Sequence, residues 1–189
     1  MFAGVFERSI YLRNFKSGDF FRGVDSRYKD NAGFVQIDIN HLLGYRGEDS
    51  ASTGVILADT LKGWHDPEQI NKYMKAFGFN KLNFYSSEDI KDLECLWQLR
   101  HSIVHTAVTI TKPDAQKVKQ LSNFSGKNIV LSNKFIYELS KRMHRLVKDA
   151  NNRLCTEFIS NIKDDVNDSE KSKIIAFFKV DSTNQKWLQ

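Results

Sequence analysis

Three side chains suited to phosphate chemistry lie in one short stretch, from Arg100 to His105. Arg100 and His105 are five residues apart, and His101 lies four residues before His105. A histidine can transfer protons near neutral pH because its ordinary pKa is about 6.5. An arginine keeps its charge and presents a planar fork that matches phosphate oxygens. Such a pair is a sufficient minimum for cutting RNA without a metal ion or a cofactor, because RNA brings its own nucleophile, the ribose 2′-hydroxyl.

We expect these residues to lie on a helix from roughly Glu88 to Val108. Ser86 can cap its first turn, and Asp89 can reach back to the cap. Apolar residues recur at helical spacing and form one face, namely Ile90, Leu93, Leu96, Trp97, Ile103 and Val104. At about 100° per residue, Arg100 falls in the middle of that face. A buried charge is costly, so it needs either an ion-pair partner or a functional role at this position. One alternative is therefore a structural ion pair, for example with Glu7.

The stretch Arg100-His101-Ser102-Ile103-Val104-His105 resembles the Arg-polar-x-x-x-His motif of the HEPN superfamily. These helical domains occur in many prokaryotic toxin, abortive-infection and RNA-processing ribonucleases. The similarity covers roughly residues 88–162, where a motif helix, a short polar excursion and a long amphipathic helix follow one another as in HEPN domains of the RiboL-PSP type. The resemblance implies a mainly α, HEPN-like helical bundle. The first half of the chain resembles the family only in being helical, with Glu7 in an early apolar helix.

The resemblance also implies an activity and a set of roles. The activity is that of a metal-independent endoribonuclease leaving 2′,3′-cyclic phosphate and 5′-hydroxyl ends, in a toxin–antitoxin, abortive-infection or anti-phage defence role. His105 would be the general acid or base and Arg100 the phosphate clamp, while His101 would orient or hydrogen-bond and Ser102 would contact the scissile phosphate. The implied partners are RNA, a second copy of the chain packed through the motif helix, and an antitoxin or other regulatory partner. Ala107 stands where one subtype has a tyrosine that its partner modifies, which argues against that scheme.

The rest of the chain indicates one helical domain over residues 1–165, with a short helix and tail over 166–189 packed on it. Other helices are predicted over residues 2–15, 50–62, 67–77, 133–162 and 171–178. Residues 16–33 look like a loop that Phe20 and Phe21 anchor to the core. Residues 34–43 fit either a strand or a helix. Between the motif helix and the long C-terminal helix, residues 108–111 and 128–131 could pair as a small β-ribbon.

Composition and charge limit the kinds of molecule that the chain is expected to bind. The 189 residues suit one domain with a substantial core, and the formal net charge of +5 favours a polyanion. A basic stripe along the long C-terminal helix could guide an RNA backbone, and it consists of Lys134, Lys141, Arg145 and Lys148. Cys95 and Cys155 fit small buried hydrophobes rather than a disulfide framework. The sequence has no bilayer-spanning apolar run and no signal-peptide start, which predicts no membrane partner and a cytoplasmic protein.

Two other functions stay open at this point. Glu94, Gln98, His101 and His105 share one helix stripe and could hold zinc or iron. That stripe lacks the glutamate after the first histidine that zinc proteases use. The second alternative is a non-catalytic HEPN-like module that binds RNA or dimerises without cutting. A purely structural role for Arg100 would predict that its removal unfolds the protein.

Overall fold

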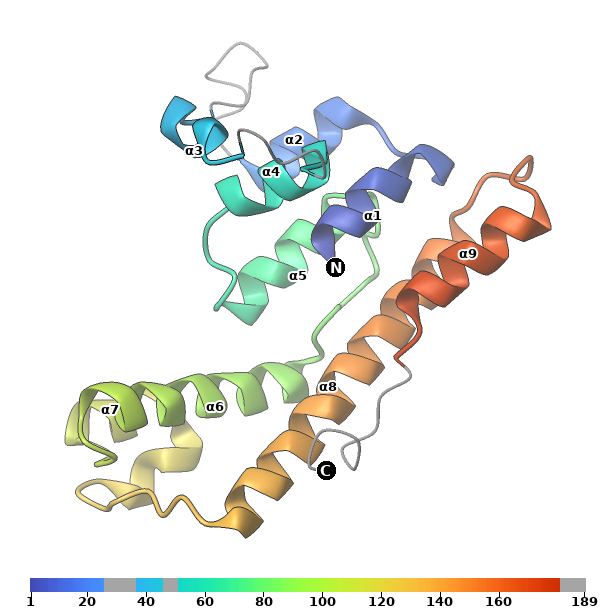
Figure 1. Cartoon of the computed structure of the whole chain (residues 1–189). Coiled ribbons are helices and arrows are strands. Elements are labelled where there is room, and N and C mark those ends of the chain that lie inside the picture. Colours follow the sequence, from blue (N-terminus) through green and yellow to red (C-terminus); the bar gives the residue numbers. More distant parts are fainter. Residues whose placement is uncertain (26–36, 46–50, 181–189) are drawn as a thin grey trace. The chain divides into compact units, whose positions relative to one another are not determined.

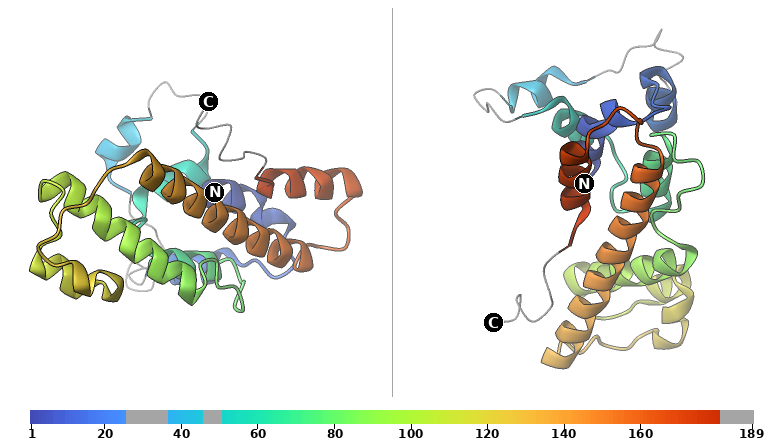
Figure 2. Two further views of the ribbon diagram at one scale, coloured as in Figure 1. Left: turned by 90° about the horizontal axis from the view of Figure 1, so that it is seen from below. Right: turned by 90° about the vertical axis from the view of Figure 1, so that its right-hand side faces the viewer.

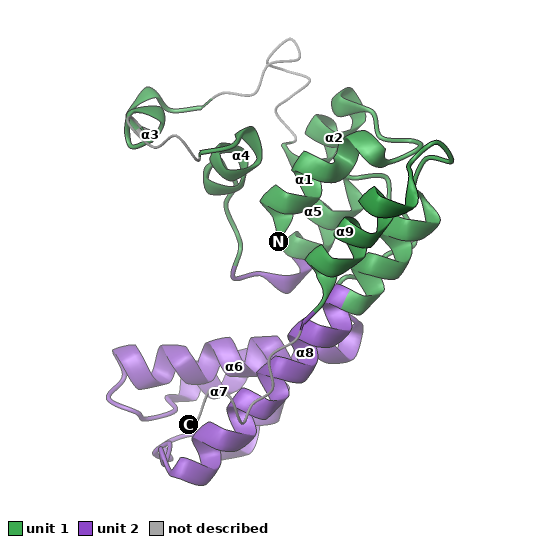
Figure 3. Ribbon diagram, turned by 45° about the vertical axis from the view of Figure 1, so that its right-hand side comes forward, with its two compact units in different colours: residues 1–64, 69–84, 152–179 green, residues 65–68, 85–151, 180–189 purple. Residues whose placement is uncertain are grey.

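A computed structural model describes residues 1–25, 37–45 and 51–180 of the chain (Figure 1). This part is mainly helical and has no sheet, which confirms the predicted α fold class. Its extended pairings are two isolated antiparallel bridges, Leu12 with Ile162 and Thr109 with Asn128. The chain divides into two compact units, which Figure 3 colours separately. Unit 1 holds residues 1–64, 69–84 and 152–179, and unit 2 holds residues 65–68, 85–151 and the chain from residue 180.

Unit 1 is built from short helices around an aromatic core. Its helices are α1 (Phe2–Arg8), α2 (Ser17–Val24), α3 (Ile39–Leu43), α4 (Thr53–Thr60), most of α5 (Pro67–Lys75), α9 (Asp168–Phe178) and the last turns of α8 (Asn133–Ser160). The ring of Phe20 is fully buried, and its centroid lies 4.7 Å from that of Phe77. This burial confirms Phe20 as a core anchor and hides apolar area that stabilises the unit.

The prediction of a loop from residue 16 is wrong for residues 17–24, which form α2. Phe20 and Val24 are one turn apart and both buried, so the segment has a helical apolar face. Gly23 lets α2 approach the turn that follows α5 closely, because a Cβ at this position would lie 2.7 Å from the Cβ of Ala76. The richness in glycine and charge hid this short periodic pattern.

Other predicted elements of unit 1 appear with shifted ends. α1 stops at Arg8 and a 3₁₀ turn (Ser9–Tyr11) follows it, whereas we predicted one helix to residue 15. α5 begins at Pro67, and Gly78, with φ of +93°, follows its end as expected. α9 packs on α8, since the rings of Phe178 and Phe158 lie 5.5 Å apart. The domain division at residue 165 stays a prediction, and the predictions for residues 26–36, 46–50 and 181–189 lie outside the described residues.

Unit 2 carries the motif. It contains α6 (Ser87–His105), α7 (Lys112–Lys117), a 3₁₀ helix (Lys119–Phe124) and most of α8 (Asn133–Ser160), the long helix seen from two sides in Figure 2. The predicted capping box begins α6: Asp89 N donates to Ser86 Oγ at 3.1 Å, and Ser86 N donates to Asp89 Oδ2 at 3.0 Å. Its small apolar core consists of Ile110, Ala115, Val118 and Leu121, with Cys95, Leu99 and Ile129 packed against it.

The predicted β-ribbon is reduced to a single bridge between Thr109 and Asn128. Backbone hydrogen bonds flank it, from Ile110 N to Lys127 O at 3.0 Å and from Ile129 N to Val108 O at 2.7 Å. The pairing therefore lies at the predicted position but forms no strands. Among the described residues, none of the helices has the length and apolar character needed to cross a membrane.

Candidate active site

The helix α6 has a buried face and an exposed face. Leu93, Gln98 and Ser102 are buried, whereas Arg100, His101 and His105 are all exposed. The prediction that Arg100 lies among core positions is therefore wrong. The apolar residues of α6 do not form one core face, because two of them are exposed beside the motif. These are Trp97, 42% exposed, and Val104, 58% exposed.

The side chain of Arg100 is exposed. Its guanidinium carbon lies 5.9 Å from the centroid of the Trp97 ring, and within the described part of the chain it forms no ion pair. Glu7, the partner considered for a structural ion pair, instead accepts a hydrogen bond from Gly54 N at 2.7 Å. The exposed Arg100 is therefore not a buried structural cation within unit 2, and its guanidinium keeps its donors available for an anion.

The two motif histidines are neighbours, as their spacing predicts. The ring centroids of His101 and His105 lie 4.8 Å apart, with 42° between the ring planes. Both side chains are exposed, on the same helix as Arg100. α6 therefore presents two proton-transfer groups and one permanent cation to solvent within two helical turns.

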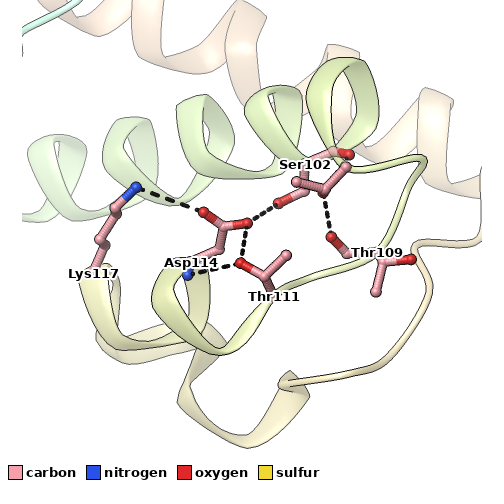
Figure 4. A network of polar contacts seen from close by, with 6 residues as sticks. Ser102, Thr109, Thr111, Asp114 and Lys117 are labelled. Atoms are coloured by element: carbon pink, nitrogen blue, oxygen red, sulfur yellow. Dashed lines mark hydrogen bonds and ion pairs between the residues drawn. The ribbon is translucent and has the colours of Figure 1, made fainter.

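Ser102 is buried, whereas the role expected for it requires an exposed side chain. Its side chain is fully buried, and its hydroxyl donates to Asp114 Oδ2 at 3.4 Å (Figure 4). The phosphate contact expected for Ser102 is not available to a buried hydroxyl. Ser102 instead connects the middle of the motif to α7, so the structure gives it a role in holding the helix.

Asp114 is the residue near the motif that the sequence reasoning missed. Its carboxylate is buried, accepts from Thr111 Oγ1 at 2.8 Å and pairs with Lys117 Nζ at 3.6 Å (Figure 4). The hydrogen bond from Thr111, opposed by burial, holds the pKa of Asp114 below its ordinary value, and the nearby His101 adds a smaller effect in the same direction. The run Thr111-Lys112-Pro113-Asp114 is a helix-start signal that could have located it.

The chain leaves α6 through an unusual turn. Thr106 N and Val108 N both donate to Ser102 O, at 3.2 Å and 3.1 Å. Ala107 and Val108 have φ of +50° and +60°, a left-handed conformation that is costly for a β-branched residue. The Thr106 hydroxyl donates to Ser102 O at 2.9 Å and also to Thr109 O. These bonds fix the helix end directly after His105.

A groove between α6 and α8 contains most of the predicted basic stripe. Its volume is about 930 Å³, and its lining includes Lys141, Arg145 and Lys148 but not Lys134. Arg142, also in the lining, pairs with Asp92 at 3.6 Å. The floor is apolar and comprises Cys95, Leu96, Leu99, Phe135 and Leu139. The motif residues Arg100, His101 and His105 are not part of this lining, so groove and motif occupy different faces of α6.

The structure also places the two cysteines and the possible metal-binding stripe. Burial, and next the charge of Asp92, raise the pKa of the Cys95 thiol, so it does not act as a ready thiolate nucleophile. Burial likewise raises the pKa of Cys155. Gln98, one member of the proposed metal stripe, is buried, whereas Glu94, His101 and His105 are exposed. No cluster of three or more histidine, cysteine or acidic side chains in the described part of the chain could hold a metal ion.

No family model, no curated protein and no solved structure shows significant similarity to this chain.

Proposed function

We propose that the chain is a metal-independent endoribonuclease of the HEPN type. The observation that carries the proposal is the joint exposure of Arg100, His101 and His105 on α6, with the two imidazole rings 4.8 Å apart. A buried motif could not meet RNA, whereas these three side chains are accessible to a phosphodiester. The family assignment itself rests on the resemblance of the Arg100–His105 stretch to the HEPN motif.

The proposed reaction needs one cation and two proton transfers. The ribose 2′-oxygen attacks the adjacent phosphorus while its proton passes to a base, and the bond from phosphorus to the 5′-oxygen breaks as that oxygen takes up a proton. His105 is the general acid or base for these proton transfers at the 2′- and 5′-oxygens. Arg100 binds the phosphate oxygens, on which negative charge increases in the transition state. His101 orients the substrate or His105. The products are a 2′,3′-cyclic phosphate and a 5′-hydroxyl, and no water molecule is consumed.

A second copy of the chain would complete the site. Trp97 and Val104 are large apolar side chains exposed next to Arg100 and His105 on α6. Exposed apolar groups that adjoin polar functional residues are typical of interaction surfaces. A two-fold dimer that packs these faces together would place two copies of the Arg100–His105 pair at one axis. RNA would then meet a composite site.

The groove between α6 and α8 would bind RNA outside the cutting site. Lys141, Arg145 and Lys148 line it and form no ion pair within the described residues. Their charges would attract phosphates without selecting a sequence. Lys134 lies outside this lining and would contribute only to the field along α8.

The proposal includes a toxin, abortive-infection or anti-phage role in the cytoplasm, in which an antitoxin or another partner inhibits the ribonuclease. The growth of a host that expresses the protein tests this role. Expression of the wild type should slow the host, and expression of His105→Ala to the same level should not. Equal growth of the two strains would contradict a toxic role.

The experiment that tests the activity is cleavage of mixed cellular RNA in the presence of a chelator. Wild type should cut, and His105→Ala should lose at least about 100-fold in rate, the typical contribution of proton transfer. Circular dichroism of both proteins provides the control for folding. If the wild type binds RNA but does not cleave it, a non-catalytic RNA-binding or dimerisation module is favoured. If the wild type cleaves RNA without the chelator but not with it, a metal enzyme is favoured.

A further inference from the structure

Unit 1 contains a depression between α2 and α5 that plays no part in the proposed cutting site. It lies beside the close contact of Gly23 with Ala76 and has a volume of about 580 Å³. Four basic side chains and one acidic side chain line it, namely Lys16, Arg22, Lys72, Lys75 and Asp19. We refer to it as the α2–α5 depression.

Most of the positive charge in the depression is uncompensated. Asp19 pairs with Arg22 on the same turn of α2. Lys16, Lys72 and Lys75 form no ion pair within the described part of the chain. Three unpaired ammonium groups around one concave surface repel one another, because like charges at close range raise the energy of the charged forms. An anion bound in the depression would relieve this repulsion.

The polar surroundings suit a phosphate chain rather than an apolar ligand. The side chains of Asn14 and Asn80 also line the depression and can donate hydrogen bonds to oxygens. Lys16 is the N-cap residue of α2, whereas Lys72 and Lys75 lie in the last turn of α5, so the three cations reach the depression from two separate segments. A lysine is a point charge that binds a phosphate without selecting a base. Several spaced cations match the repeating charge of a nucleic-acid backbone better than a single small anion.

We propose that the α2–α5 depression binds the phosphate backbone of single-stranded RNA, through Lys16, Lys72 and Lys75. The inference rests on the proposed function in its choice of RNA, and it gives unit 1 a role in holding the substrate. It predicts binding that depends strongly on salt and little on sequence, because each neutralised phosphate releases a counterion.

The test measures binding without cutting. The full chain carrying His105→Ala is titrated against a fluorescent single-stranded RNA of mixed sequence and against the 2′-deoxy oligonucleotide of the same sequence. The variant Lys16→Gln/Lys72→Gln/Lys75→Gln removes the three cations and keeps polar side chains of similar helix propensity. The control Lys81→Gln/Lys163→Gln/Lys171→Gln removes the same charge from unit 1 outside the depression.

The depression variant should bind about tenfold more weakly, and the slope of log K against log salt should fall by about 2, as three lost contacts to a single strand imply. The control should keep nearly the same affinity and slope. Equal losses in both variants, or no loss in the depression variant, would overturn the proposal. Displacement of the oligonucleotide by ATP at equal phosphate concentration would also overturn it, because the ligand would then be a free nucleotide.

The outcome is separable from that of the cleavage experiment. The 2′-deoxy strand carries the same phosphates but has no 2′-hydroxyl, so it reports on the depression whether or not the chain cuts RNA. If the depression variant alone loses binding and the wild type does not cleave RNA, the depression is a binding site but the chain is not a ribonuclease. If the wild type cleaves RNA and the depression variant binds normally, the chain is a ribonuclease but the depression is not a binding site.

Discussion

The Ser102 hydroxyl donates a hydrogen bond to the buried carboxylate of Asp114 at 3.4 Å, and so ties the centre of the motif to the first turn of α7. Thr111 Oγ1 and Lys117 Nζ hold the other lone pairs of this carboxylate. The exposed residues of the motif and its buried anchor therefore belong to one helix. We predict that stability and the proposed activity can be changed separately.

Asp114→Asn should lower the free energy of unfolding by about 1–3 kcal/mol, because the amide loses the ion pair with Lys117 and accepts more weakly than a carboxylate from Ser102 and Thr111. The measurement is chemical denaturation at neutral pH. Asp164→Asn is the matched control, since the Asp164 side chain is exposed and pairs with Arg13 at the surface. Equal stability of Asp114→Asn and wild type would contradict the anchoring role of Asp114.

The same carboxylate gives a pH dependence of defined sign. The pKa of Asp114 is lower in the folded protein than in the unfolded chain, so its contribution to stability is complete above the unfolded pKa, about 3.9. That contribution is lost as the pH falls through the folded pKa. The wild type should therefore lose more stability than Asp114→Asn between pH 5 and the acid limit of the measurement, here roughly pH 3.

Arg100→Ala should leave the fold intact, because the side chain is exposed and has no ion pair in the described part of the chain. We expect a change in unfolding free energy within about 0.5 kcal/mol and a loss of at least about 100-fold in RNA cleavage. Arg13→Ala, which removes an exposed arginine from unit 1, should keep the activity. Unfolding of Arg100→Ala would support a purely structural arginine and contradict the proposed clamp.

His101→Gln should reduce cleavage by less than about tenfold, whereas His105→Ala removes a proton-transfer group worth about 100-fold or more. The reason is that glutamine keeps a hydrogen-bonding side chain beside His105 and so preserves an orienting role. Rates of both variants across pH 5 to 8, roughly the range in which histidine titrates, provide the measurement. An equal loss in the two variants would show that both histidines transfer protons.

Val104→Glu should abolish the proposed dimer and the cleavage activity together, because a carboxylate would be buried without a partner at the two-fold axis. Sedimentation equilibrium and the cleavage assay provide the two readouts. Val130→Glu is the matched control, because Val130 is 75% exposed in the same unit but does not lie on α6. A monomeric wild type that cuts RNA would rule out the composite site.

Local signals allowed much of the helical framework to be predicted. The capping box of Ser86 and Asp89, the Pro67 start of α5 and the long periodicity of α8 each act within a few residues, so sequence alone reveals them. The pairing of Thr109 with Asn128 was also placed correctly, although it forms only a bridge. The neighbouring positions of His101 and His105 follow from helix geometry alone.

Tertiary contacts decided the features that the sequence did not reveal. Ser102 is buried because Asp114, twelve positions further along the chain, packs over it. Arg100 is exposed because no described residue of unit 2 covers the side of α6 that carries Trp97 and Val104. Helical periodicity alone cannot distinguish a core face from an exposed apolar face. In α2, the buried Phe20 outweighed the loop-like composition.

The most direct test of the central claim is the chemistry of the RNA ends left by the wild type in chelator. Attack by the 2′-hydroxyl predicts a 5′-hydroxyl that polynucleotide kinase labels without prior phosphatase treatment, and a 2′,3′-cyclic phosphate that blocks extension of the 3′ end. His105→Ala should yield neither end above background. Fragments with 5′-phosphate and 3′-hydroxyl ends would mean that water had attacked the phosphate, and would contradict the roles proposed for Arg100 and His105.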